Sequence, residues 1–124
     1  MSEYKEVRPK TIFMDIDGTL VQHVSPFESA KRNHKMELLP GTIEKLEEWD
    51  MKGYILILTT GRKESCRKEL EKQLSDVGIM YDQLVMGICG GIRVLINDRK
   101  PYGDFNTAVS INLDRNQGIE NIKI

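Results

Sequence analysis

Cysteine is scarce in this chain: Cys66 and Cys89 are the two among 124 residues, too few for a disulfide framework. Their separation does not match that of a metal-binding pair, so we expect both to be small buried residues. Long apolar runs are absent as well. No run approaches the roughly 20 residues that span a bilayer, and residues 1–10 have no apolar signal-peptide core. The sequence therefore predicts a cytoplasmic protein that does not contact membranes.

An excess of charge of either sign is also missing. The chain has 18 Lys and Arg residues against 19 Asp and Glu residues, which gives a net charge of -1. Without a general basic field, nucleic acid is not an expected partner. Hydrophobic residues make up 40% of the chain, which excludes the composition of a disordered segment. The length matches one unit of folding, so we predict a single domain over residues 1–124.

Apolar and amphipathic segments alternate along the chain. Residues 11–16 (TIFMDI) and 54–60 (YILILTT) are typical of strands that are buried on both faces. Between and after them, helices are predicted over 42–53, with Thr42 as the N-cap, and over 62–77. This alternation predicts a three-layer, Rossmann-like α/β fold with a mostly parallel sheet and helices on both faces.

Three further strands, over 83–86, 93–97 and 107–113, would make the sheet five-stranded. The link between the third and fourth strands is shorter than the dozen or more residues that a parallel crossover needs, so the fourth strand is the least constrained. The segment after Leu113 either docks at an edge or contacts another subunit. The segment 21–39 is too short for a cap domain, and its histidines, His23 and His34, are expected at the surface.

Acidic, hydroxyl and basic side chains collect where the predicted strands end. Asp15 and Asp17 follow the first strand, Thr60 and Arg62 the second, and Asp98 the fourth. Because parallel strands end at one edge of a sheet, we expect these residues to meet there. Gathered carboxylates repel one another unless a cation binds them, and oxygen ligands suit Mg²⁺ better than zinc. The pattern therefore predicts a magnesium site.

Three motifs, DIDGTL (15–20), TTGR (59–62) and IND (96–98), each follow a predicted strand. In this order they resemble the motifs of the haloacid dehalogenase superfamily of phosphohydrolases, and the lack of a cap resembles its capless subgroup. The resemblance extends from about Thr11 to Leu113. It implies an HAD-like fold and a Mg²⁺-dependent phosphatase that forms an aspartyl-phosphate. The implied substrate is a phosphorylated sugar or a related small metabolite.

The resemblance also implies a role for each matching residue. Asp15 would be the nucleophile, and Asp17 would protonate the leaving group and later activate water. Asp15, the backbone carbonyl of Asp17, and Asp98 would hold Mg²⁺, and Thr60 would bind a phosphoryl oxygen. Contacts with the substrate are implied for Gly18, Thr19, Gly61 and Arg62. From the residues alone, Arg62 could instead pair with the acidic side chains that follow it.

The sequence departs from the family pattern in two places. The lysine that normally precedes the last acidic motif is absent, and Lys100 is the preferred replacement. Arg93 is the second choice, because it starts the predicted fourth strand and is expected to point away from the chemistry. Asn97 stands beside Asp98 where a second acid is commoner, which leaves one charged metal ligand fewer.

Two other classes of function remain open. A phosphoacceptor signalling module combines similar residue types, but such domains carry their acceptor aspartate after the third strand, where this chain has Met86 and Gly87. The other alternative is a noncatalytic sugar-phosphate-binding protein of the same architecture. A site without a cap can either take a large substrate or be closed by a neighbouring copy, so a homo-oligomer is one of two expectations.

Overall fold

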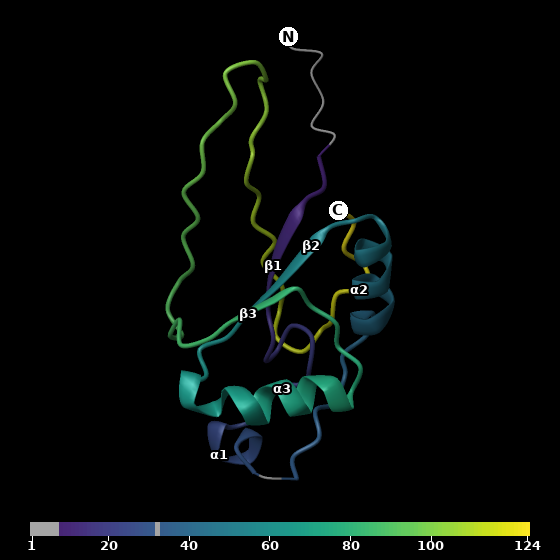
Figure 1. Ribbon diagram of the computed structural model, residues 1–124, viewed down its shortest axis with the longest axis vertical. Helices are drawn as coiled ribbons and strands as arrows, with labels where there is room; N and C mark the ends of the chain where they lie inside the picture. The colour runs from purple at the N-terminus through teal and green to yellow at the C-terminus, as the bar shows by residue number, and fades with distance from the viewer. Residues whose placement is uncertain (1–7, 32) are drawn as a thin grey trace.

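The fold is built on one small parallel sheet. The computed structural model describes residues 8–31 and 33–124. Figure 1 shows the sheet at the centre of the molecule, with the strands in the order β1-β2-β3. Its strands are β1 (Thr11–Asp15), β2 (Ile55–Thr59) and β3 (Gln83–Val85).

The register of the sheet aligns the carboxyl ends of its strands. Asp15 is the partner of Thr59 in the β1 and β2 pair, and Thr59 is the partner of Val85 in the β2 and β3 pair. All three strands are parallel, so the residues that follow them emerge at one edge. The predicted α/β fold with a parallel sheet is confirmed.

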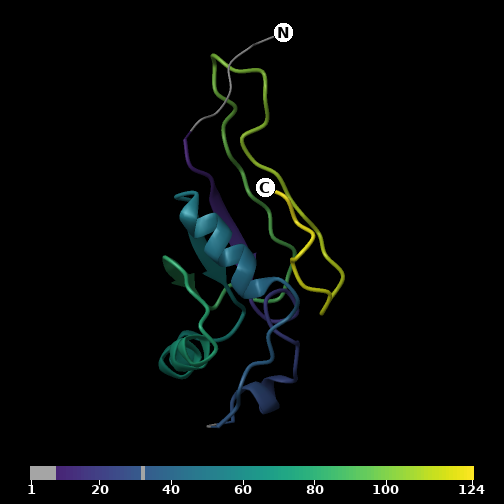
Figure 2. The same ribbon diagram turned by 90° about the vertical axis from the view of Figure 1, so that its right-hand side faces the viewer.

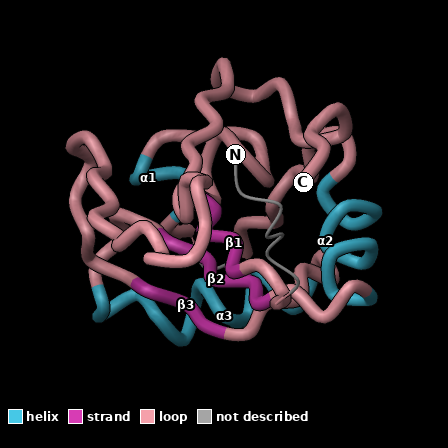
Figure 3. Tube along the Cα trace, turned by 90° about the horizontal axis from the view of Figure 1, so that it is seen from above, coloured by secondary structure: helices cyan, strands magenta, loops and turns pink. Residues whose placement is uncertain are grey.

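Helices join and cover these strands. The predicted second helix begins five residues later than expected, because residues 61–63 form a loop before it. In Figure 3, seen from above, α2 lies at one end of the molecule while α3 runs beneath the strands. The helical elements are α1 (Pro26–Ser29), α2 (Thr42–Met51), the short 3-10 helix η1 (Glu64–Cys66) and α3 (Arg67–Asp76).

The start of α2 differs from the prediction. Gly41 is the N-cap, with a positive φ of 85°, and Thr42 is the first helical residue. The Thr42 hydroxyl is fully buried and donates to the carbonyl of Leu20 at 2.6 Å. A buried hydroxyl needs such a partner, so Thr42 joins α2 to the loop that follows β1 instead of capping the helix.

The core is formed by buried residues of the strands together with residues of α2 and α3. In β1 buried and exposed residues alternate, so that Phe13 stays 55% exposed, whereas the three central residues of β2 are all buried. Burial on both faces was predicted for both strands and holds for β2. The buried strand residues pack with apolar residues of α2 and α3, namely Ile12, Met14, Leu56, Leu58, Leu84, Leu46, Trp49, Leu70 and Leu74.

The predicted strands over 93–97 and 107–113 are not formed, so the sheet of the described chain has three strands and not five. Instead, residues 92–113 form two extended limbs that reach past the sheet (Figures 1 and 2), and we call them the arm. The backbone turns at Gly87 and Cys89, both with positive φ, and the short link has no crossover that could return the chain as a parallel strand. Apolar side chains of the arm are therefore exposed, Ile96 by 92%.

The segment after Leu113 docks against the body of the protein. Ile119 is buried, and its N–H donates to the carbonyl of Pro40 at 2.9 Å. The N–H of Asn116 donates to the carbonyl of Gly18 at 2.8 Å. Of the two roles considered for this segment, intramolecular docking is the one observed.

Both cysteines were expected to be buried, and both are exposed. Cys66 ends the short helix η1, and Cys89 has a positive φ of 60° in the turn that leads to the arm. Neither position belongs to the face of an element that packs on the core. Across residues 8–31 and 33–124, no helix combines the length and the apolar character needed to cross a bilayer.

Candidate active site

Asp15 is the last residue of β1, and its side chain reaches solvent at the carboxyl edge of the sheet. Within the described chain, Asp15 forms no ion pair. Partial desolvation and the neighbouring charge of Asp17 raise the pKa of Asp15 above its ordinary value. A backbone hydrogen bond at Ile16 and the charges of Arg93 and His23 oppose this rise. The carboxylate is therefore unpaired and available to a ligand.

Asp17 lies two residues further on and has a different environment. Arg62 donates two hydrogen bonds to the Asp17 carboxylate, from Nε at 3.1 Å and from the NH2 nitrogen at 2.7 Å. Both side chains are largely buried, with 15% of Arg62 and 23% of Asp17 exposed. A two-point contact of this kind fixes both the position and the plane of the carboxylate. Arg62 therefore pairs with an acid of the first motif, and not with the acids that follow it in sequence.

Gln73 of α3 holds the far side of the Arg62 guanidinium. Its Oε1 accepts from the NH1 nitrogen of Arg62 at 3.0 Å, and its Nε2 donates to the carbonyl of Ser29 at 3.0 Å. The residue is only 1% exposed. Sequence reasoning missed Gln73, although one signal was present: it lies three residues after Leu70 and directly before Leu74, on the apolar face of the helix.

Thr60 and Gly61 follow β2 at the same edge of the sheet as the residues that follow β1. Thr60 is 1% exposed, its N–H donates to the carbonyl of Val85, and its hydroxyl accepts from the N–H of Arg62 at 3.1 Å. A Cβ at Gly61 would lie 3.2 Å from the carbonyl oxygen of Cys89, so a larger residue would press on the next loop. The Thr60 hydroxyl keeps its proton for an acceptor such as a phosphoryl oxygen.

Gly18 and Thr19 form the turn that follows the two aspartates. Gly18 has a φ of 88°, which favours glycine, and its N–H donates to the carbonyl of Val21 at 2.8 Å. The docked C-terminal segment braces this turn, because Asn116 Oδ1 accepts from the N–H of His23 at 2.8 Å. Nothing in the sequence indicated that Asn116 would reach this loop.

The arm places the remaining predicted site residues differently from the expectation. The Arg93 guanidinium donates to the carbonyl of Gly91, and its charge is one of the minor influences that oppose the raised pKa of Asp15. Asp98 and Lys100 form an ion pair with each other at 3.3 Å, and the Asp98 side chain is 70% exposed. Asp98 and Lys100 lie away from the strand ends because the predicted fourth strand, which would have carried them there, does not form. Within the described residues, no three Asp, Glu, His or Cys side chains gather as metal ligands.

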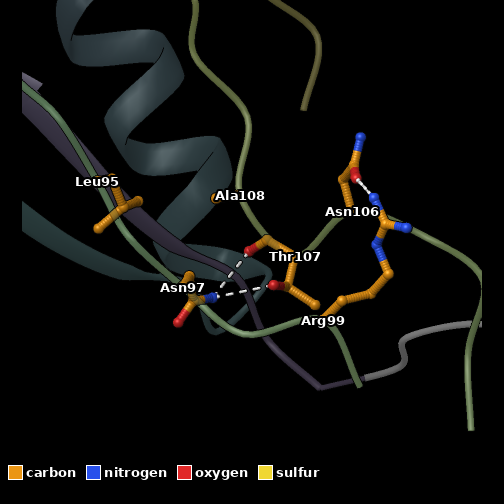
Figure 4. A pocket seen from close by; sticks show the side chains of 6 residues that line it. All are labelled: Leu95, Asn97, Arg99, Asn106, Thr107 and Ala108. Atoms are coloured by element: carbon orange, nitrogen blue, oxygen red, sulfur yellow. Dashed lines mark hydrogen bonds between the residues drawn. The ribbon is translucent and has the colours of Figure 1, made fainter. Parts of the chain in front are cut away.

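A shallow hollow of about 390 Å³ lies between the two limbs of the arm, and Figure 4 shows the side chains that line it. Asn97 bridges the limbs by donating to the carbonyl and the hydroxyl of Thr107, at 3.2 and 3.1 Å. Neither the two aspartates of the first motif nor Thr60 belongs to its lining, so this hollow is separate from the candidate active site. The hollow is lined by Leu95, Asn97, Arg99, Asn106, Thr107 and Ala108.

The residues at the strand ends fit a magnesium ion. Mg²⁺ binds through one or two carboxylates, keeps several waters and completes its shell with substrate phosphate. Asp15 offers an unpaired carboxylate, whereas both carboxylate oxygens of Asp17 are engaged by Arg62. Asp17 is therefore left with its backbone carbonyl as a ligand.

Two of three similar solved structures share this fold, with TM-scores above 0.5. One chain of the Pnkp1/Rnl/Hen1 complex is 26% identical over 76% of this chain, with a TM-score of 0.56, although this chain spans only 34% of that one. A structure-determination target from Vibrio cholerae is 21% identical, with a TM-score of 0.53, over 75% of this chain and 83% of the other. A D,D-heptose 1.7-bisphosphate phosphatase from B. bronchiseptica, complexed with magnesium and phosphate, is 18% identical, with a TM-score of 0.47, over 65% and 51%.

A comparison with curated proteins gave no significant match. The family model for haloacid dehalogenase-like hydrolases, however, matches residues 12–98, which include both aspartates of the first motif, the TTGR loop and Asp98. This match spans more than half of the sequence and agrees with the parallel sheet and with the residues at its edge. The chain belongs to the haloacid dehalogenase-like hydrolases.

Proposed function

We propose that this hydrolase is a phosphomonoesterase in which Asp15 is the nucleophile and Asp17 the general acid and base. One observation carries the proposal: two aspartates at the end of the same strand have opposite environments. Asp15 is exposed and has no ion partner in the described chain, while Arg62 holds Asp17. An uncovered carboxylate can reach phosphorus, and a carboxyl held in a fixed position two residues away can transfer protons to and from the reacting oxygens.

In the first step, a carboxylate oxygen of Asp15 forms a bond to phosphorus and the bond from phosphorus to the ester oxygen breaks. The departing alkoxide takes a proton from Asp17, which must enter this step protonated. The Thr60 hydroxyl donates a hydrogen bond to a phosphoryl oxygen and so orients the phosphoryl group. Gly61 leaves room for the phosphate beside the loop, and Gly18 and Thr19 shape the turn that faces it.

In the second step, Asp17 accepts a proton from a water molecule while the oxygen of that water bonds to phosphorus. The bond from phosphorus to the Asp15 oxygen breaks, which releases inorganic phosphate and restores the Asp15 carboxylate. Asp17 ends protonated and ready for the next cycle. Arg62 keeps the Asp17 carboxyl in place during both transfers, because its guanidinium contacts both oxygens.

Magnesium is part of the proposal. Asp15 and the backbone carbonyl of Asp17 would hold the ion, and its charge would reduce the repulsion between the Asp15 carboxylate and the substrate phosphate. Asp98 would join them only if the arm folded against the free edge of β1. An Asp98→Ala variant tests this: a raised Mg²⁺ requirement supports Asp98 as a ligand, and an unchanged requirement removes it from the set.

A phosphorylated sugar or a related small metabolite is the proposed substrate, and the cytoplasm the proposed compartment. Between residues 21 and 39 the described chain has only the four-residue α1, which leaves Asp15 uncovered on that side. We also propose that a second copy covers the site. The exposed apolar side chains of the arm support such self-association, and sedimentation velocity tests it.

The deciding experiment measures hydrolysis of an aryl phosphate by the purified chain with Mg²⁺, after chelation, and after Mg²⁺ is restored. We expect turnover that stops with the chelator and returns with the metal. Asp15→Asn should reduce turnover to background because an amide oxygen is a poor nucleophile. Asn matches Asp in size, so circular dichroism should show an intact fold.

The matched control is Asp104→Asn, a substitution in the arm outside the proposed site. It should leave turnover within about twofold, as expected for a surface change away from the reacting groups. Near wild-type turnover by Asp15→Asn would contradict the covalent mechanism. Binding of a sugar phosphate without any turnover would instead favour the noncatalytic alternative.

A further inference from the structure

Gln73 is a fully buried polar side chain that the reaction steps above do not use. It lies on α3, where the neighbouring core positions are filled by Leu70 and Leu74. Burying an amide costs free energy unless its donors and acceptors are satisfied, and an apolar residue would fill this position without that cost. The contacts of Gln73 show what the amide provides that a leucine could not.

The two ends of the Gln73 amide face different parts of the molecule. Its oxygen accepts from Arg62, whose other edge grips Asp17, and its nitrogen donates to the carbonyl of Ser29 at the end of α1. A chain of hydrogen bonds therefore runs from α1 through α3 to the loop after β1. Every side chain in this chain of contacts is at least three-quarters buried.

We propose that Gln73 is a positioning residue, which sets the orientation of Asp17 by fixing the guanidinium of Arg62. The inference rests on the proposed function, because it assumes that Asp17 transfers protons. Arg62 has a planar fork of donors, and anchoring NH1 leaves its Nε and NH2 edge with one direction in which to point. Without this anchor the guanidinium can rotate, and the Asp17 carboxyl rotates with it.

Two substitutions separate this role from simple packing. Gln73→Met fills a similar volume but removes both hydrogen bonds. Gln73→Glu keeps an acceptor for Arg62, but it replaces the donor to Ser29 with a second oxygen and adds a negative charge. Asp82→Ala is the control for lost stability, because the Asp82 carboxylate accepts from the N–H of Leu56 at 2.8 Å, near the start of β2 and away from the site.

Two substrates are compared for each variant: an alkyl phosphate, whose leaving group needs a proton, and an activated aryl phosphate, whose leaving group does not. A misplaced general acid slows the first substrate selectively. We expect Gln73→Met to lower kcat for the alkyl phosphate by about tenfold or more. The same variant should change kcat for the aryl phosphate far less. Gln73→Glu should restore most of the alkyl rate, and Asp82→Ala should lower both rates equally or neither.

A measurement that does not need turnover accompanies the kinetics. In NMR spectra the Nε–H of Arg62 should give a protected signal in the wild type and in Asp82→Ala, and should exchange faster with water in Gln73→Met. An unchanged ratio of the two rates together with a protected Arg62 signal in Gln73→Met would overturn the inference. If the wild type hydrolyses neither substrate, the proposed function fails, and the Arg62 signal still decides whether Gln73 fixes the guanidinium.

Discussion

Asp15 and Asp17 are the same residue type two positions apart, and they differ in their surroundings. At the edge of the sheet Asp15 has lost part of its water and faces the charge of Asp17, so its pKa is raised. Arg62 compensates the charge of Asp17 directly. The sequence predicts that both acids lie at this edge, and the motif implies their roles. Neither the raised pKa nor the partner of Asp17 could be read from the order of residues.

The raised pKa of Asp15 predicts a stability gain at neutral pH on replacement by Asn. A carboxyl whose pKa is higher in the folded state favours folding while it is protonated, and that contribution is lost as the pH rises through its folded pKa. Ionised Asp15 therefore opposes folding at neutral pH. Thermal melts should show a higher Tm for Asp15→Asn than for the wild type at pH 7.

The same comparison at lower pH provides the control. Below the ordinary value of 3.8, Asp15 is protonated in both the folded and the unfolded chain, so the difference in Tm should disappear. A gain that persists unchanged at pH 3 would assign the effect to packing around the side chain. A loss of stability at pH 7 would contradict the direction of the pKa shift.

Arg93 and Lys100 are the residues whose predicted positions depended on a fourth strand. A parallel strand over 93–97 would put Arg93 at its far end and Lys100 at the site. In the structure this strand does not form and Lys100 pairs with Asp98, while the charge of Arg93 only partly opposes the desolvation that raises the pKa of Asp15. Strand direction depends on the path of the preceding loop, which residue pattern does not specify.

This placement predicts which cation assists the reaction. Because the charge of Arg93 reaches Asp15 while Lys100 is paired with Asp98, Arg93→Ala should lower kcat more than Lys100→Ala does. Lys100→Ala should change kcat by about twofold or less. Steady-state kinetics on folded variants of equal Tm would test the ranking. The reverse ranking would restore Lys100 as the replacement for the missing family lysine.

Among the elements, β1, β2 and α2 follow closely from sequence, because local signals agree with their burial. The strand segments are apolar runs that end at acids or hydroxyls, and α2 ends before Gly53, whose φ is 78°. In the arm, by contrast, the local sequence signals do not agree with the observed burial. Its apolar residues resemble those of a buried strand, but burial depends on a partner strand, and the described chain provides none.

The docking of the C-terminal segment depends on glycine at one position. Gly118 has a φ of 84°, and a Cβ there would lie 2.5 Å from the carbonyl oxygen of Pro40. We expect Gly118→Ala to reduce the free energy of unfolding by about 2–4 kcal/mol, from backbone strain and overlap together. Urea denaturation measures this difference.

Gly53→Ala is the matched control for Gly118→Ala. Gly53 has a similar φ of 78°, but a Cβ there meets no atom within 4 Å. Only the backbone strain remains, so a loss of about 1–2 kcal/mol is expected. Equal losses in the two variants would show that the segment shifts away from Pro40 at little cost.

At the scale of the whole molecule, the arm lies in sequence between the body of the protein and the C-terminal segment, which contact one another. The body holds the sheet and the helices, and the residues after the arm pack back onto it through the buried Ile119. Between them, exposed positions such as Arg99 lie in extended chain with no regular secondary structure, where a protease can bind.

A cut after Arg99 would therefore not release the C-terminal piece. Ile119 is buried in the core, Ile122 and Ile124 pack against it, and Asn116 is hydrogen-bonded to the turn at Gly18. The two pieces would stay together as a noncovalent complex and separate only on denaturation. By the same reasoning, the chain divided at this bond and produced as two polypeptides should reassemble by fragment complementation.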